Sequence, residues 1–547
     1  MNGNNDFTIY SGGKGIGDGR DSGPGPVNGT TGPAAPGGPS GSDGPGSGGP
    51  GGSGCGMPVF GVSDPYISLW LKDEPLGYQP ALGPRISLSL SYNHREDQIG
   101  ADKTISSLGR KWNFSWLSYV AQDAATNKIV RLPRGGSISF TNTVDFFTNT
   151  RLTGDTTNGF TLSYPDGSKY LYGLIATNSA GAFQRAFLTE ESNPVGQKTR
   201  FEYYSYNPSN GVACLKDVVD GDGQISTITY TNHTFGTNLI SAVTDRFNRS
   251  ASFRYDASGN LISVTDVAGL KSTFGYDANG WITNMITPYG TTSFKIIDHN
   301  SGVVAPNGRS IEITEPDGSK QLFLYTNSAP GVASSYSTNQ IPSTYPYTNT
   351  LETNSLDVRN TFHWGRLQYA NLSTNFLLTD DISKLQSSDY LNADMKHWLL
   401  EGSNTVSGVL SMERLPSADG TTEGQKTWYD HAGKTNINYL GTQSSPLIVA
   451  RVLPDGTSSY WRTDRNSWGS VSNEVNTYST SSTVYQRTNI YAYATNEIDL
   501  ITITNALGVQ VSSNAYNSYH QVVTNFNALN QLTVYTYNIN PQPSQRI

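Results

Sequence analysis

The sequence predicts a mainly β protein of repeated β-hairpins, with one helix-bearing insert and a disordered N-terminal tail. Its composition favours strands and turns: the chain has 32 Tyr and 57 Gly, and only 15% of its residues are charged. A Pro-Asp-Gly turn signal recurs along the chain, and one stretch, "YDASGN", returns as "YDANGW" after 21 residues. Repeats of this length form arrays in which neighbouring units share a core.

The first 56 residues are predicted to be a disordered tail or linker. Residues 11–56 are mostly Gly and Pro, and the Gly spacing breaks the every-third-residue register that a collagen helix needs. Cys55 lies in this tract and Cys214 far beyond it, and the sequence leaves their disulfide state open.

A β-rich opening domain is predicted over residues 57–150. In "RISLSLSYN" the apolar residues alternate with serines, which places Ile86, Leu88, Leu90 and Tyr92 on one strand face. The aromatic residues Trp112 and Trp116 are expected to be buried in the wall of the protein.

A first block of repeats is predicted over residues 151–330. Hairpin tips are expected at "YPDGSKYLY" (164–172), "EPDGSKQLF" (315–323) and "LPDGTSSYW" (453–461), because Pro, Asp and Gly each suit one turn position. The 21-residue unit matches residue by residue, so a structural role in turns and strands is expected for its signature residues: Asp245, Tyr255, Asp256, Gly259, Asp266, Tyr276, Asp277 and Gly280.

A loop and helix-bearing insert is predicted over 331–424, and a second repeat block over 425–547. A helix is expected at 387–402, where Leu391, Met395, Trp398 and Leu399 form one apolar face. In the second block Tyr516 and Tyr537 lie 21 residues apart, and Asn replaces Asp at the turns. We expect this block to be truncated.

The pairing of "YDASGNL" with "TDRFNR" and "TDVAG" resembles the YD repeat of RHS proteins, the bacterial relatives of the teneurin shell and of Tc-toxin cocoon subunits. "GYQPALGPRISLSLSYNHRED" is similar to the segment that opens their repeat region. The resemblance implies that the repeated hairpins form part of a spiral shell. It also implies that this shell segment scaffolds, encloses or presents a partner polypeptide, as in polymorphic toxins, in an extracellular or cell-surface protein. The family's C-terminal core signature is missing, so we expect the N-terminal part of a longer RHS protein.

Other functions are weighed against this interpretation. An acidic balance of 44 Asp and Glu against 36 Lys and Arg, without basic runs, argues against nucleic-acid binding. The start of the chain has no signal-peptide pattern, and no apolar run is long enough to span a membrane. We expect no catalytic residue, metal or cofactor, since the acidic cluster at Asp217, Asp220 and Asp222 does not have the ligand spacing of a calcium loop.

Two alternatives stay open. The first is a carbohydrate-binding adhesin, for which Trp281, next to a repeat glycine, is the candidate glycan contact. The second and weaker one is a secreted hydrolase, for which the adjacent carboxylates Glu190 and Glu191, or Asp380 and Asp381, would be the candidate groups.

Overall fold

The structure of the chain is a computed structural model. It describes residues 57–546 apart from 97–104, 134, 146–147, 179, 205–212, 234–235, 299–307, 344–346, 348–349, 403–404, 481–482 and 538–542. The predicted tail, Cys55 included, lies outside the described residues. Within the described part, no helix is both long and apolar enough to cross a bilayer.

Two small sheets come from the first part of the chain. One has the order β1-β2-β3-β4 and the other the order β12-β13-β5-β6-β7, so the second takes strands from both sides of residue 150. Their bounds are β1 Val59–Ser63, β2 Ser68–Tyr78, β3 Ile86–Asn93, β4 Trp112–Phe114, β5 Tyr119–Gln122, β6 Lys128–Arg131, β7 Ser137–Phe140, β12 Leu174–Thr177 and β13 Phe183–Phe187.

All remaining strands form one antiparallel sheet, in which nearly every strand pairs with the next along the chain. The strand order closes into a ring, with β38 followed by β8 and β9. The first half comprises β8 Val144–Asp145, β9 Thr150–Asp155, β10 Gly159–Ser163, β11 Lys169–Tyr172, β14 Glu190–Ser192, β15 Lys198–Tyr203, β16 Leu215–Val219, β17 Ile225–His233, β18 Gly236–Thr244, β19 Ser250–Tyr255, β20 Leu261–Thr265, β21 Lys271–Tyr276, β22 Ile282–Thr287, β23 Gly290–Asp298, β24 Arg309–Thr314 and β25 Lys320–Thr326.

The second half of the large sheet continues through the segment predicted as an insert. It comprises β26 Asn360–Trp364, β27 Asp394–Glu401, β28 Thr405–Arg414, β29 Lys426–His431, β30 Pro446–Val452, β31 Ser458–Arg465, β32 Val471–Thr480, β33 Thr483–Tyr493, β34 Leu500–Thr504, β35 Gln510–Tyr516, β36 Val522–Asn527, β37 Leu532–Tyr537 and β38 Pro543–Arg546. The predicted mainly β fold class of repeated hairpins is confirmed.

The prediction of a helix over 387–402 was wrong beyond its first turns. Helix α3 covers only Ser387–Leu391, and the following residues form β27. Met395 and Trp398 therefore lie in different hydrophobic clusters on opposite faces of the sheet, since β27 is held between β26 and β28. Sheet pairing has overridden a helical pattern of apolar residues. The other helical segments are short: α1 Arg366–Ala370, α2 Thr374–Thr379, η1 Thr338–Gln340 and η2 Ile382–Lys384.

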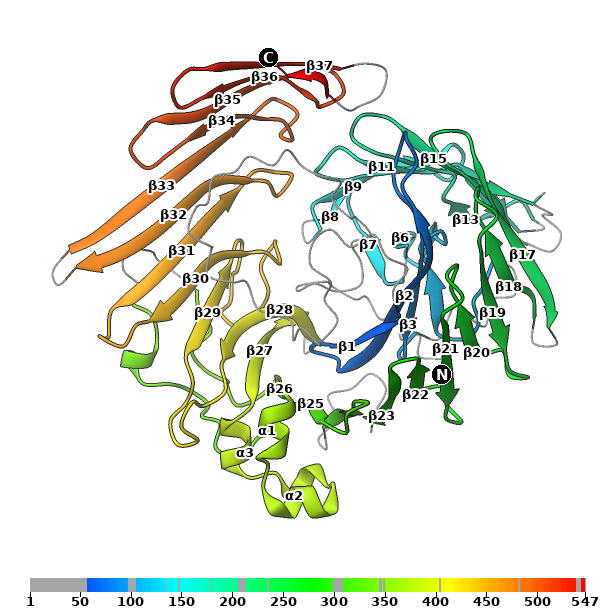
Figure 1. Cartoon of the computed structure of the whole chain (residues 1–547). Helices are drawn as coiled ribbons and strands as arrows, with labels where there is room; N and C mark the ends of the chain where they lie inside the picture. The colour runs from blue at the N-terminus through cyan, green and yellow to red at the C-terminus, as the bar shows by residue number, and fades with distance from the viewer. Residues whose placement is uncertain are drawn as a thin grey trace.

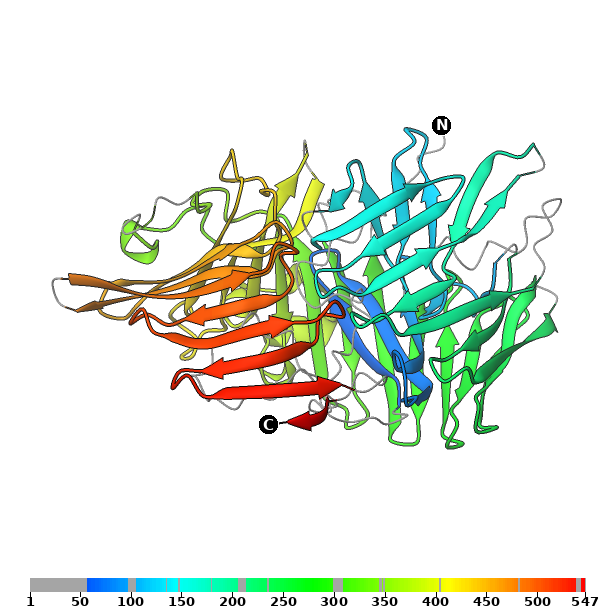
Figure 2. The same cartoon turned by 90° about the horizontal axis from the view of Figure 1, so that it is seen from above.

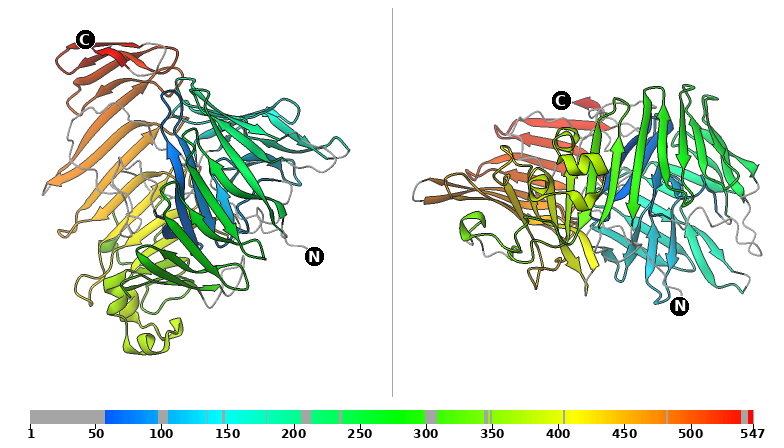
Figure 3. Two further views of the ribbon diagram at one scale, coloured as in Figure 1. Left: turned by 45° about the vertical axis from the view of Figure 1, so that its right-hand side comes forward. Right: turned by 90° about the horizontal axis from the view of Figure 1, so that it is seen from below.

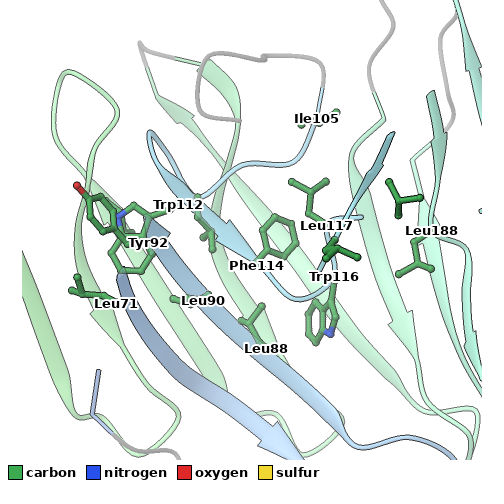
Figure 4. Close-up of a cluster of buried hydrophobic side chains, with 14 of the residues drawn as sticks. Leu71, Leu88, Leu90, Tyr92, Ile105, Trp112, Phe114, Trp116, Leu117 and Leu188 are labelled. Atoms are coloured by element: carbon green, nitrogen blue, oxygen red, sulfur yellow. The ribbon is translucent and has the colours of Figure 1, made fainter. Parts of the chain in front are cut away.

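The large sheet curves around the two small sheets, which lie inside its first half (Figures 1 and 3). One hydrophobic cluster joins them: Leu71, Leu90 and Tyr92 of the first sheet are buried with Phe253 and Phe274 of the curved wall. Figure 4 shows part of this cluster around Trp112 and Phe114. Trp112 and Trp116 are both buried, as predicted, but they lie on and just after β4 of the small inner sheet and not in the wall itself. The second cluster lies on the outer face of the sheet, where α1, α2 and α3 cover it.

Candidate functional site: the repeat turns and the concave face

The carboxylates of the repeat signature lie in hairpin turns. Oδ1 of Asp256 accepts hydrogen bonds from the backbone N–H groups of Ser258 and Asn260, each at 2.9 Å. The N–H of Gly259 donates to the carbonyl oxygen of Asp256 at 3.1 Å, which closes the turn between β19 and β20. Oδ1 therefore satisfies two backbone donors that the turn exposes.

The other three signature carboxylates repeat this arrangement. Asp277 accepts from the N–H groups of Asn279 (2.9 Å) and Trp281 (2.8 Å). Asp266 accepts from two turn N–H groups at 2.8 Å, and Asp245 from two at 2.9 and 3.0 Å. The spacing from carboxylate to donor residues, two and four positions, is the same in each turn.

In the second half of the sheet, asparagine accepts the same turn hydrogen bonds. Oδ1 of Asn517 accepts from the N–H groups of Tyr519 (2.9 Å) and Gln521 (3.1 Å). Its Nδ2 donates to Oε1 of Gln521 at 2.7 Å. Only an acceptor oxygen is needed at this turn position, so a negative charge is dispensable there.

The glycines of the signature occupy a left-handed backbone position. Gly259 and Gly280 have φ values of +79° and +75°, a backbone conformation that residues with a side chain rarely adopt. Asn530 and His520 stand at the matching positions of later turns, with φ of +55° and +60°. Asn is the side-chain-bearing residue that tolerates this region best.

The repeat tyrosines form a ladder of hydrogen bonds between strands. The hydroxyl groups of Tyr230, Tyr255 and Tyr276 donate to the carbonyl oxygens of Leu215, Ile240 and Leu261, each 15 residues earlier and each at 2.6 Å. The late tyrosines Tyr516 and Tyr537 donate in the same way to Leu500 (3.1 Å) and Val522 (2.7 Å).

Burial raises the pKa of Tyr255 and Tyr276 well above the ordinary value of a phenol. Both hydroxyl groups are therefore protonated donors at any physiological pH.

A β-bulge accompanies each of these tyrosines. The strand register shifts between Arg254 and Tyr255, and again between Gly275 and Tyr276. The same shift precedes Tyr516 and Tyr537. Bulges bend a strand and increase its twist, so a bulge in every repeat favours a curved wall.

The inner side of the first half of the sheet is covered by the N-terminal sheet. The ring of Phe274 lies 5.0 Å from that of Trp112, and the Trp112 indole Nε1 donates to the hydroxyl of Tyr276 at 2.9 Å. At the repeat turns, the Tyr92 hydroxyl donates to the carbonyl of Gly280 at 3.3 Å. The repeat signature thus builds the wall and anchors the sheet inside it.

Trp281, the candidate glycan contact, is half-buried. Its ring meets that of His94 edge-on, with 5.7 Å between the centroids. Packing against a buried histidine is a structural contact, and it gives no support to a sugar-stacking role.

The acidic residues weighed as ligands or catalysts are engaged with neighbouring groups. Arg246 bridges Asp220 (3.2 Å) and Asp222 (2.9 Å). Asp217 pairs with Lys216 at 2.8 Å. No group of three or more metal-ligating side chains was found among the described residues. Glu190 pairs with Lys198 at 2.7 Å, and Asp381 accepts from the N–H of Ser383 at 2.9 Å.

A seam that sequence reasoning missed joins the two halves of the ring. The Arg151 guanidinium on β9 lies 4.1 Å from the centre of the Trp468 ring and donates to Ser467 Oγ at 3.0 Å. Glu497 lies 3.9 Å from Arg151 across the same seam. In Figure 2 these late hairpins meet the first strands of the sheet. Contacts between residues more than 300 positions apart leave no periodic signal in a sequence.

Comparison with known proteins gives one family and several solved structures. The family model described as RHS Repeat matches residues 236–270 and 255–292. No curated protein matches the chain. A crystal structure of TcdB2-TccC3-TEV shares 10% identity over 88% of this chain and 23% of that chain, with a TM-score of 0.24.

Two further solved structures are similar over much of the chain. The Tc holotoxin pore of Photorhabdus luminescens shares 9% identity over 83% of this chain and 27% of that chain, with a TM-score of 0.15. A porin-like protein from Bacteroides uniformis shares 11% identity over 69% of this chain and 94% of that chain, also at 0.15. TM-scores of this size do not establish a shared fold.

The chain spans about a quarter of the first of these structures. The matched segment, 236–292, contains all eight signature residues whose turns and ladder bonds are described above. Residues 236–292 are therefore RHS repeats, and the chain contains an RHS-repeat segment.

Proposed function

We propose that this chain is a structural shell segment that scaffolds and encloses or presents a partner polypeptide in an exported or cell-surface protein. The observation that carries the proposal is the curved sheet itself. Its first half already holds a polypeptide, the N-terminal sheet, against its concave face through Phe253, Phe274 and Trp112.

The chemistry that recurs in each repeat supports a mechanical role. Its carboxylates accept backbone hydrogen bonds, its tyrosines link strands, and its bulges favour curvature. Each of these contacts engages a polar group of the repeat in holding the wall together. A wall of this kind supplies enclosure, and its specificity comes from the side chains on the concave face.

Protease protection of a fused polypeptide tests this function. An unstructured, protease-sensitive polypeptide is fused after Ile547, and in the matched control it is fused before Met1. The scaffold role predicts that the C-terminal fusion is cut at least several-fold more slowly, since it follows directly on the second half of the wall. Equal cleavage rates in the two fusions would overturn the proposal.

A further inference from the structure

The second half of the sheet carries a concave face of different chemistry. Phe274 faces the concave side, and its paired residues can be traced from strand to strand across the sheet. On this same face the path reaches Tyr491, Asn514 and Tyr535. We name this surface the tyrosine–asparagine face. Its residues are Tyr491, Tyr493, Asn514, Tyr516, Asn525, Tyr535 and Tyr537.

Matching positions of the repeat show what has changed. Two residues before the repeat tyrosine, the first half has Phe253 and Phe274, each 4% exposed. The second half has Tyr491, Asn514 and Tyr535 there, and all three are half-buried. Phenylalanine suits a permanent core, whereas Tyr and Asn suit a surface that meets water before it meets a partner.

The tyrosine–asparagine face is ordered by its own hydrogen bonds. Nδ2 of Asn525 donates to Oδ1 of Asn514 at 2.7 Å, and Nδ2 of Asn514 donates to the carbonyl of Leu500 at 3.0 Å. The hydroxyl groups of Tyr516 and Tyr537 are fixed in the ladder. A surface whose side chains are already oriented loses less conformational entropy on binding.

The hairpin turns along one edge of this face are bare. In the first half, turns on the same edge contact the N-terminal strand: the N–H of Val267 donates to the carbonyl of Pro75 at 3.0 Å, and the Phe247 ring meets Tyr78 at 5.5 Å. In the second half, Leu507 and Leu529 occupy such turns and are 86% and 77% exposed, against 57% for Phe247. The second half thus repeats the docking surface without its occupant.

The charge of the surface indicates the chemistry of that occupant. Strands β34 to β37 contain no Asp, Glu, Lys or Arg, and all their residues are half-buried or exposed. This part of the surface, made of tyrosines and amides, fits a partner that is itself apolar on one side. At its β33 end the Tyr491 hydroxyl donates to Glu474 at 3.1 Å. The first half shows the form such a partner takes, because β2 and β3 present alternate apolar residues, among them Leu71 and Leu90.

We propose that the tyrosine–asparagine face and the turns at Leu507 and Leu529 dock a separate polypeptide in β conformation with apolar residues at alternate positions. This inference rests on the proposed scaffold function and names the partner's chemistry. The contacts it invokes are uncharged, so the affinity is expected to change less than twofold between 50 and 500 mM salt.

A peptide of residues 68–93, which forms β2 and β3, is a suitable probe. It carries the alternating apolar pattern and has two basic and two acidic side chains, Lys72, Asp73, Glu74 and Arg85. The full chain is produced with p-benzoylphenylalanine in place of Tyr535, on the face, or in place of Thr536, on the opposite side of β37. Cross-linking of the labelled peptide is expected from position 535 and at least tenfold less from position 536.

Binding of the same peptide gives a second readout. The double substitution Tyr491→Ala and Tyr535→Ala should weaken the affinity at least tenfold, while Thr536→Ala leaves it within twofold. Hydrogen exchange in β19 to β22 checks that the double variant keeps its fold. No binding, equal cross-linking from both positions, or equal binding of a scrambled peptide would overturn the docking proposal. Protection of the C-terminal fusion alongside any of these results would leave the scaffold function standing.

Discussion

Removing one hydroxyl group from the tyrosine ladder tests the structural role of the repeat signature. In Tyr276→Phe, the carbonyl of Leu261 loses a 2.6 Å hydrogen bond and the buried indole N–H of Trp112 loses its 2.9 Å acceptor. The bond to the carbonyl is worth about 1 kcal/mol, and an unsatisfied buried donor costs about 1–3 kcal/mol. The expected loss in stability is about 2–4 kcal/mol.

Tyr537→Phe is the matched control. It removes the same ladder bond, to Val522 at 2.7 Å, from a half-buried tyrosine whose region water can reach. Water replaces the lost partner there, so the expected cost is below about 1 kcal/mol. Native-state hydrogen exchange of the amides in β20–β21 and β36–β37 measures each loss locally, which suits a chain of this length better than a global unfolding curve.

A double-mutant cycle isolates the indole contribution. Adding Trp112→Phe to Tyr276→Phe removes the donor that Tyr276→Phe leaves unsatisfied, so the two losses should be non-additive by about 1–2 kcal/mol. Equal losses in the Tyr276 and Tyr537 variants, or additive losses in the cycle, would refute the reasoning.

Three further predictions concern single side chains. Asp277→Asn should change stability by less than about 0.5 kcal/mol and Asp277→Ala should lower it by about 1 kcal/mol, measured by hydrogen exchange in β21 and β22, because Asn keeps the acceptor for two turn N–H groups; equal effects would contradict the turn role. Burial raises the pKa of Asp73 from 3.8 to about 7, so its contribution to stability falls as pH rises from about 4 to about 7. Asp73→Asn should remove that dependence and stabilise the fold at pH 8 by up to about 4 kcal/mol in urea unfolding, and an unchanged pH profile would count against it. Burial also raises the pKa of Cys214 to about 11, so alkylation by iodoacetamide at pH 8 should be far slower than for a free thiol; a rate equal to that of glutathione would show the thiol to be accessible.

Local features of the fold could be predicted from the sequence because they depend on neighbouring residues. The Pro-Asp-Gly signals are confirmed as hairpin tips, with Gly167, Gly318 and Gly456 at positive φ. The helix over 387–402 could not be predicted correctly, because pairing with β26 and β28 decides the conformation of Asp394–Glu401. The spacing of apolar residues along the sequence carries no information about such strand partners.

The residues of the candidate site could be predicted from the sequence, but the parts of the chain that surround the site could not. The recurrence of Tyr255 and Tyr276 identifies the repeat, but the ladder bonds connect each tyrosine to a carbonyl, which any residue supplies. The N-terminal sheet inside the wall and the seam at Arg151 join distant parts of the chain.

The distance across the seam tests the central claim, that the repeats build a ring-shaped wall. Spin labels are placed on the exposed residues Thr153 and Thr495, next to Arg151 and Glu497, with Cys55 and Cys214 replaced by Ser. Double electron–electron resonance should give a single narrow distribution at the short end of the measurable range, and Arg151→Ala should broaden it. A broad distribution centred at long distances in the otherwise unchanged chain would mean that the sheet is open, and would contradict the account.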